Sequence, residues 1–175
     1  MSENSIQPES LSPAPGSRRT RTIVAVVGGL LVIFVLMQFV RFIVPSFEIS
    51  NPAVTQTINW DSPRTEQLAR TACFDCHSNE TDWRWYSYIA PVGWLVARDV
   101  NEGRGTLNFS IGNYRAIREA AEVIQEGEMP PATYLLTHSN AKLNDAAKTE
   151  LIAGLRATFS GVQIGAEDEG GGDDD

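Results

Sequence analysis

The longest hydrophobic pattern in the chain is the uncharged run IVAVVGGLLVIFVLMQFV, from Ile23 to Val40. Arg41 can extend its charged end to a membrane surface, and the apolar stretch then continues to Val44. About 20 such residues span the hydrocarbon core of a bilayer as a helix. A buried helix of a soluble protein is a poor alternative, because so long an apolar run has no solvated face. The pattern therefore predicts a single transmembrane helix over residues 22–44.

Helical periodicity resumes after a predicted linker over residues 45–60. Ser62 is a suitable N-cap, with Pro63 at the first helical position. The apolar side chains of this first helix share one face: Leu68, Ala69, Ala72, Cys73 and Cys76. A second helix can open at Pro91 and run through Val100, with Gly103 as its end.

Two more amphipathic segments complete the pattern. One, YRAIREAAEVIQEG, has Gly127 as its stop and apolar residues at helical spacing: Tyr114, Ile117, Ala121 and Ile124. The last has Asn144 as its cap and apolar residues four apart: Ala147, Leu151, Leu155 and Phe159. Four modest helices with short loops predict one small all-α domain over residues 51–160.

The residues before the apolar stretch are polar and end in a cluster of arginines. Residues 1–21 begin with a segment rich in Ser, Pro and Glu without apolar periodicity, which predicts a disordered tail. Arg18, Arg19 and Arg21 stand directly before the predicted membrane helix. Because cytoplasmic flanks carry the excess of Lys and Arg, this tail is predicted to be cytoplasmic. Everything after Pro45 is then on the extracytoplasmic side of the cell membrane.

A cleaved signal peptide is the alternative to an anchor. Val44 and Ser46 are small enough for the positions before a cleavage site, which would leave a chain beginning at Phe47. The apolar region of a signal peptide usually has about 7 to 15 residues, fewer than this chain has. An uncleaved anchor is therefore favoured. Both alternatives deliver the rest of the chain to an oxidising compartment.

Net charge matters less than where it is located. The formal net charge is −8, whereas 13 acidic and 10 basic side chains between Asn51 and Phe159 leave that part at −3. Residues 161–175 are rich in Gly, Asp and Glu and predict an acidic disordered tail, with docking to a basic partner as the alternative. The clustered Lys and Arg of a nucleic-acid surface are missing, so nucleic acid is not an expected partner.

The two cysteines carry the strongest chemical signal. Cys73 and Cys76 are three residues apart, which places both thiols on one helical face, and His77 follows directly. A structural zinc site needs four ligands, and His138 stands alone far downstream. A thioredoxin-like dithiol follows a buried strand, and no convincing strand precedes Cys73. Covalent haem attachment uses two thiols and the adjacent histidine, so the motif predicts one haem c.

A histidine on one side of the iron leaves the other axial position to be assigned. Met37 lies in the predicted membrane helix, so Met129 is the available thioether. Two prolines follow it, which gives a stiff loop that suits a ligand held at a fixed distance. Met129 is therefore the predicted second metal ligand beside His77. His138 and an open position are the alternatives.

Aromatic residues are densest directly after the cysteine motif. A haem would supply apolar mass to a domain rich in Ala and Gly, and these rings can form one of its walls. Ordinary packing is the alternative for each ring. The cluster comprises Trp83, Trp85, Tyr86, Tyr88 and Trp94.

Two longer stretches carry a resemblance to a known family. LARTACFDCHSNETDWRWYSYIAPVGWLVARDVNEGRGTLNFS and IQEGEMPPATYLLTHSNAKLNDAAKTELIAGL resemble the small haem-binding domain family of membrane-anchored, c-type cytochrome-like proteins, over roughly Asn51 to Phe159. The resemblance implies a monohaem cytochrome c fold, with Cys73 and Cys76 as thioether sites and His77 as proximal ligand. The predicted fold is thus an all-α, cytochrome c-like bundle of about four helices around one haem, preceded by a single transmembrane helix.

Two functions agree with these features. The first is an electron carrier at the outer face of the cytoplasmic membrane, which exchanges single electrons with redox partner proteins in or at the membrane. The second is a haem-based gas-binding or sensing module with an open or exchangeable sixth iron position. A peroxidase-like enzyme is a weaker alternative, because His138 alone hardly supplies distal acid and base groups. The electron carrier, which is not an enzyme, is the predicted function, and the oligomeric state is not predicted.

Overall fold

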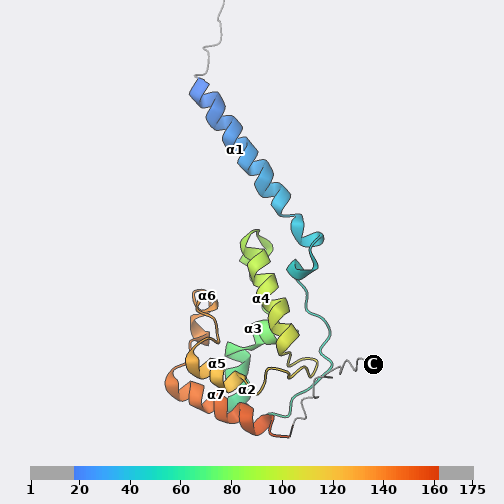
Figure 1. Ribbon diagram of the computed structural model, residues 1–175, viewed down its shortest axis with the longest axis vertical. Helices are drawn as coiled ribbons and strands as arrows, with labels where there is room; N and C mark the ends of the chain where they lie inside the picture. The colour runs from blue at the N-terminus through green and yellow to red at the C-terminus, as the bar shows by residue number, and fades with distance from the viewer. Residues whose placement is uncertain (1–17, 162–175) are drawn as a thin grey trace, which may run out of the picture. The chain divides into compact units, whose positions relative to one another are not determined.

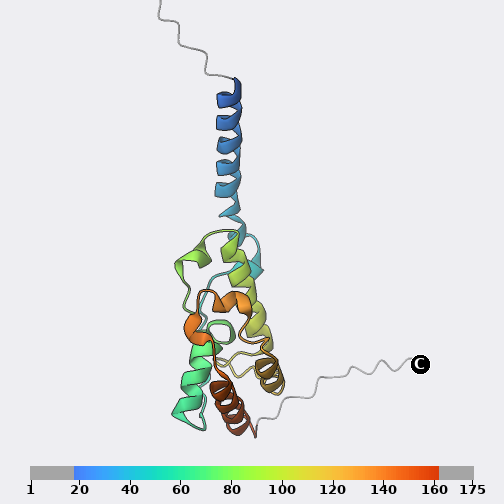
Figure 2. The same ribbon diagram turned by 90° about the vertical axis from the view of Figure 1, so that its left-hand side faces the viewer.

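The computed structural model describes residues 18–161 (Figure 1, Figure 2). This part of the chain is all-helical and has no β-strand, which confirms the predicted all-α class. It divides into two compact units between Phe39 and Val40. The predictions for residues 1–17 and 162–175 lie outside the described residues. The helices are α1 Arg18–Met37, η1 Val40–Phe42, η2 Pro45–Phe47, α2 Pro63–Ala72, α3 Phe74–His77, η3 Trp85–Tyr88, α4 Val92–Thr106, α5 Ala120–Glu126, α6 Ala132–Leu135, η4 Ser139–Ala141 and α7 Asp145–Thr158.

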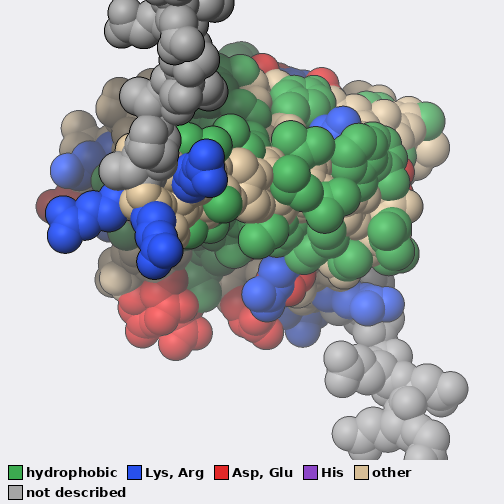
Figure 3. Space-filling model, turned by 90° about the horizontal axis from the view of Figure 1, so that it is seen from above, with side chains coloured by type: hydrophobic (Ala, Val, Ile, Leu, Met, Phe, Trp, Pro, Cys, Tyr) green, Lys and Arg blue, Asp and Glu red, His purple; other side chains and the backbone are tan. Residues whose placement is uncertain are grey.

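The first unit is the apolar helix α1, none of whose residues is buried. The apolar span continues through η1, from Arg18 to Phe42, and an 18-residue window within it has a mean hydropathy of 2.8. Figure 3 shows hydrophobic side chains gathered over this segment, and Lys and Arg side chains where it begins. Its length and composition are compatible with a single-pass membrane anchor, as the pattern over residues 22–44 predicted.

The core of the second unit lies where α2 and α5 pack against α7. Leu68 of α2, Ile124 of α5 and Leu151 of α7 are buried in one apolar cluster. Gly154 lets α7 approach α2 closely, because a Cβ at this position would clash with the side chain of Thr65. These three helices therefore form the base on which the remaining elements are placed.

A group of aromatic rings extends this core to the segment before α2. The ring of Trp60 lies 6.3 Å from Phe74, 5.7 Å from Phe109 and 6.1 Å from Phe159. Phe74 and Phe109 stack at 5.3 Å. Trp60, which the sequence placed in a linker, is thus part of the core. Because Phe74 is the first residue of α3, this packing also fixes that short helix.

The predicted helix caps at both ends of the domain are confirmed. The Ser62 hydroxyl accepts a hydrogen bond from the Thr65 amide at 3.1 Å, and the Asn144 side chain accepts one from the Ala147 amide at 2.9 Å. Gly127 ends α5 with a φ of 81°, a conformation in which glycine has no steric penalty. Capping chemistry that is local in sequence was therefore predicted correctly.

Three helix boundaries differ from the prediction. The helix predicted from Tyr114 begins only at Ala120, because residues 114–119 form turns that fold back on the end of α4, where the Ala116 amide bonds the Thr106 carbonyl. Helix α4 continues past Gly103 to Thr106. The cysteine motif does not end α2, because the backbone breaks at Cys73 and a new helix, α3, starts at Phe74. In the first case a contact between segments overrides the local pattern.

Candidate functional site

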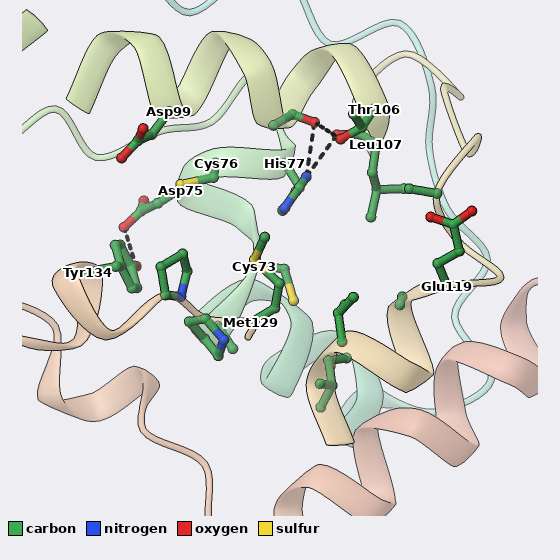
Figure 4. A pocket seen from close by; sticks show the side chains of 18 of the residues that line it. Cys73, Asp75, Cys76, His77, Asp99, Thr106, Leu107, Glu119, Met129 and Tyr134 are labelled. Atoms are coloured by element: carbon green, nitrogen blue, oxygen red, sulfur yellow. Dashed lines mark hydrogen bonds between the residues drawn. The ribbon is translucent and has the colours of Figure 1, made fainter. Parts of the chain in front are cut away.

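A cavity of about 630 Å³ lies between α3, α4, α5 and the loop that leads to α6 (Figure 4). Ligand and cofactor sites in proteins typically have volumes of about 300–1,000 Å³. Most of the wall is apolar, and its larger members are Leu107, Phe109, Val123, Ile124, Leu151 and Leu155. The second unit therefore contains an apolar site of the size that a cofactor needs.

Both cysteines line this cavity. Cys73 lies at the junction of α2 and α3, and Cys76 lies within α3. Burial raises the pKa of each thiol to about 12, and the nearby carboxylates of Asp75 and Asp99 contribute for Cys76. The thiols are thus protonated at neutral pH, whereas dithiol oxidoreductases depend on a thiol with a lowered pKa. The pair is poorly suited to dithiol redox chemistry.

Two backbone carbonyls of distant residues hold the His77 ring through its Nδ1 atom. Its Nδ1 lies 3.0 Å from the Gly103 carbonyl oxygen and 3.1 Å from that of Leu107, and burial lowers the pKa of the ring. A neutral imidazole must carry its proton on Nδ1 to donate to these carbonyls, so Nε2 keeps its lone pair. Such an outer hydrogen bond is typical of metal-bound histidines. His77 is therefore oriented as a ligand toward the cavity.

The close packing of α3 on α4 depends on Gly103. A Cβ at Gly103 would lie 2.7 Å from the Cys76 carbonyl oxygen, so Gly103→Ala must push the two helices apart. We expect this variant to lose about 1–3 kcal/mol of stability, as overpacked sites do, and to hold less haem. Gly105→Ala is the matched control, because nothing lies within 4 Å of that position. Thermal unfolding and haem content per chain test this, and equal behaviour of the two variants would contradict it.

Met129 lies across the opening from His77, on the loop after α5 (Figure 4). The amides of Glu128 and Met129 both bond the Val123 carbonyl, at 2.9 and 3.1 Å, which turns the chain back toward the cavity after α5 ends. The Met129 side chain is 39 % exposed. The structure thus brings Cys73, Cys76, His77 and Met129 to one cavity. Their roles as attachment sites and iron ligands stay predictions.

Comparison with known proteins adds one finding. The sequence model of the haem-binding domain family matches residues 32–157, which is most of the chain. The chain belongs to the haem-binding domain family. No curated protein and no solved structure matches it.

The cavity fits the cofactor of this haem-binding domain. Its apolar wall can cover a porphyrin, the two half-buried thiols lie in that wall, and His77 presents an unprotonated nitrogen. In residues 18–161, no group of three or more His, Cys, Asp and Glu side chains is arranged to hold a metal ion.

His138 does not line the haem cavity. Its ring is buried and stacks on Tyr134 at 3.8 Å. Nδ1 lies 2.9 Å from the Thr137 hydroxyl, and Nε2 lies 3.5 Å from a carboxylate oxygen of Asp75. The His138 ring therefore makes polar contacts beside α3. Met129 lines the cavity, and His138 does not.

Asp75 connects the cysteine motif to the segment after Met129, a link that sequence reasoning missed. The Tyr134 hydroxyl donates to Asp75 Oδ2 at 2.7 Å, and the Asp82 amide donates to Oδ1 at 3.0 Å. Burial, and then the bond to Asp75, raise the pKa of Tyr134, which therefore stays protonated as the donor. In the sequence, the only sign of this link was a carboxylate between the two cysteines. Its position gave no indication that Tyr134 is its partner.

Removal of this tie should loosen the loop that carries Met129. We expect Tyr134→Phe to cost about 1.5 kcal/mol of unfolding free energy, the low end for a hydrogen bond to a charged group, because Asp75 is 23 % exposed. Tyr86→Phe is the matched control, since that hydroxyl makes an exposed 3.2 Å contact with Thr137. Denaturant unfolding of both variants tests the difference. Equal losses would show that the Asp75 bond has no special role.

The charged side chains that line the cavity are all acidic. They are the carboxylates of Asp75, Asp99, Glu102 and Glu119, and no Lys or Arg is among the lining residues of the described chain. Burial, and then the charge of Glu102, raise the pKa of Asp99. Arg104 is on the same helix, but its guanidinium bonds the Ser78 carbonyl oxygen at 2.7 Å. The haem propionates would therefore find no cation among these lining residues.

The aromatic cluster does not form a wall of the cavity, which leaves ordinary packing, the alternative, for these rings. None of Trp83, Trp85, Tyr86, Tyr88 and Trp94 lines the cavity. Trp83 donates to Asn51 at 3.0 Å, and Trp94 stacks on Phe47 at 5.4 Å. Trp83 and Trp94 thus hold the segment that precedes α2, Trp85 and Tyr88 are exposed, and Tyr86 contacts Thr137. The wall is built from shorter side chains of α4, α5 and α7, which let a flat cofactor lie close to the helices.

Proposed function

We propose that this haem-binding domain is a membrane-anchored monohaem c-type cytochrome that transfers single electrons. In this proposal Cys73 and Cys76 would hold the haem covalently through thioethers, and His77 and Met129 would bind its iron. The observation that carries the proposal is the orientation of His77, whose Nδ1 is occupied by two carbonyls while two thiols flank the same cavity.

The bound haem supplies a one-electron couple, and the protein sets its properties. Backbone bonds hold His77 on α3, and the turn after α5 holds Met129, so little needs to rearrange when the charge changes. The apolar wall excludes water from the cofactor. Binding of the Met129 sulfur to the iron would raise the reduction potential of the haem. The four carboxylates that line the cavity would favour the oxidised form.

The electron partners are proposed to be redox proteins in or at the membrane. We propose that α1 spans the cytoplasmic membrane with its amino terminus inside, because the arginines precede the apolar segment.

This topology predicts the behaviour of reporter fusions. A reporter joined after Phe159 should be active only if it is an enzyme that works outside the cytoplasm, because the positive-inside rule places that end across the membrane. The same reporter joined before Arg18 is the control and should be inactive. Amino-terminal sequencing should find no mature chain that begins at Phe47. Such a chain would show that the anchor is cleaved.

A gas-binding or sensing module is the second candidate. The observation in its favour is the exposure of Met129, because a ligand on a surface loop can leave the iron and admit a diatomic gas. Visible spectra of oxidised and reduced protein, with and without carbon monoxide, decide between the two. Rapid carbon monoxide binding by the unchanged protein would favour sensing over electron transfer. We do not propose an enzyme, since His138 bonds Thr137 outside the cavity and is not placed as a distal acid or base.

A further inference from the structure

Large apolar side chains are exposed at the end of η1 and directly after it, on η3 and on the first turns of α4. They are Phe42, Ile43, Trp85, Tyr88, Val92 and Leu95, and we refer to them as the apolar face. Ile43 is 79 % exposed, Trp85 75 % and Leu95 61 %. Soluble proteins rarely leave so many large apolar groups together in water without a function.

Specific contacts make this face part of one rigid surface. The Arg41 guanidinium lies 4.7 Å from the centre of the Phe42 ring and 6.0 Å from that of Tyr88, which joins η1 to η3. η3 lies tightly against α4, because a Cβ at Gly93 would be 2.9 Å from the carbonyl carbon of Ser87. Arg41 therefore links η1 to η3, which in turn packs on α4.

The segment that follows η1 is also fixed to α4. The Phe47 ring stacks on Trp94, with centroids 5.4 Å apart and planes within 7°. The side-chain amide of Asn101 donates to the carbonyls of Ser46 and Glu48, at 3.1 and 3.3 Å. Residues 46–48 are thus attached to α4 by a ring stack and two hydrogen bonds.

Chain continuity indicates what covers the apolar face. The apolar span ends at Phe42, which is itself a member of the face, and Ile43 follows directly. If α1 spans a bilayer, these residues must lie where the chain leaves the hydrocarbon core. Trp85 and Tyr88 belong to the residue types that are enriched at this depth, where an apolar ring body and a polar edge are both satisfied.

We propose that the apolar face lies in the head-group region of the bilayer that holds α1, so that the haem domain rests on the membrane. The occupant is lipid, not a second copy of the chain or another protein, because the face continues directly from the membrane span. This inference rests on the proposed anchor and does not depend on the haem. Arg41 is placed to meet lipid phosphates at the same level.

The apolar face and the cavity both include residues of helix α4, so docking of the face also positions the cavity. Val92 and Leu95 are in its first turns, whereas Asp99, Glu102 and Thr106 line the cavity. At 1.5 Å per residue, Asp99 is about 10 Å and Thr106 about 21 Å from Val92 along the helix. Docking therefore holds the haem site at a set distance from the membrane surface, within reach of partners embedded there.

Photolabelling by lipid tests this docking. The full holoprotein is placed in nanodiscs that contain a phosphatidylcholine with a diazirine near its head group, irradiated and digested for mass spectrometry. Adducts are expected in η3 and the first two turns of α4, in addition to the end of α1. Ile111, 49 % exposed on the turn beyond the far end of α4, should carry no adduct. In the double variant Trp85→Ser, Leu95→Ser, labelling of Tyr88 and Val92 should fall to the level at Ile111.

The other outcomes overturn the proposal in distinguishable ways. Adducts that stop at Ile43 in the unchanged protein, with η3 and α4 clean, would show a tethered domain that does not dock. Cross-links from the face to a second copy or another protein, without lipid adducts, would identify a protein occupant. If α1 carries no adducts, the anchor fails and the docking fails with it. Haem content of the same sample is measured separately and tests the cofactor alone.

Discussion

The double variant Cys73→Ser, Cys76→Ser is expected to retain no covalent haem. Each thiol lies in the wall of the haem cavity, and a serine hydroxyl cannot form the thioether that joins a porphyrin to the chain. Made in a host with a haem-ligation system, the unchanged protein should carry one haem per chain. On a denaturing gel stained for haem, it should give a band, and the double variant should give none.

The single variants and a control make this result specific. Cys73→Ser and Cys76→Ser each leave one thiol and should retain less haem than the unchanged protein. Thr133→Ser alters another lining residue without touching a thiol and should retain all of it. If the unchanged protein is exported, intact and unstained, covalent attachment is wrong, whereas the family assignment to haem binding would stand.

The second large effect is expected from Met129→Ala. If its sulfur occupies the sixth iron position, the oxidised protein shows a weak long-wavelength charge-transfer band from sulfur to iron. The reduced protein then binds carbon monoxide slowly or hardly at all. The variant should lose the band, bind carbon monoxide rapidly and have a lower reduction potential, because a thioether favours ferrous iron. Axial ligands set haem potentials over a range of about 0.8 V, so the shift should be measurable by redox titration.

His138→Ala is the matched control for this experiment. His138 is the other histidine, but it contacts Tyr134, Thr137 and Asp75 outside the cavity. Its removal should leave the charge-transfer band unchanged and cost about 1–3 kcal/mol of stability, because a buried ring and the contacts it makes are lost. An unchanged protein without the band, whose bis-histidine magnetic signal disappears in His138→Ala, would reverse the ligand assignment and leave haem attachment intact.

The sequence by itself determined the features whose causes are local. An unbroken apolar run identified α1, side chains three residues from their targets identified the caps at Ser62 and Asn144, and the need for a positive φ identified Gly127. The thiol spacing and the adjacent His77 identified the cofactor class, because that chemistry is confined to five consecutive residues. The family match agrees with this part of the prediction.

Tertiary structure decided everything that depends on residues far apart in the chain. The sequence suggested Gly103 as a helix end, but it is a contact point for Cys76 within α4. The aromatic cluster suggested a cofactor wall, but its rings hold the entry segment or stay exposed. Asp75 finds Tyr134 across 59 positions, and no local pattern encodes such a pair.

Contacts between distant residues also explain why the sequence could suggest a second iron ligand but could not show where its side chain lies. The sequence predicted Met129 and kept His138, nine residues later, as an alternative. The turn after α5, closed by two amides on the Val123 carbonyl, brings one of them to the cavity. Stacking on Tyr134 keeps the other outside it. Residue chemistry sets which groups are able to bind iron, whereas chain packing sets which of them lies within reach.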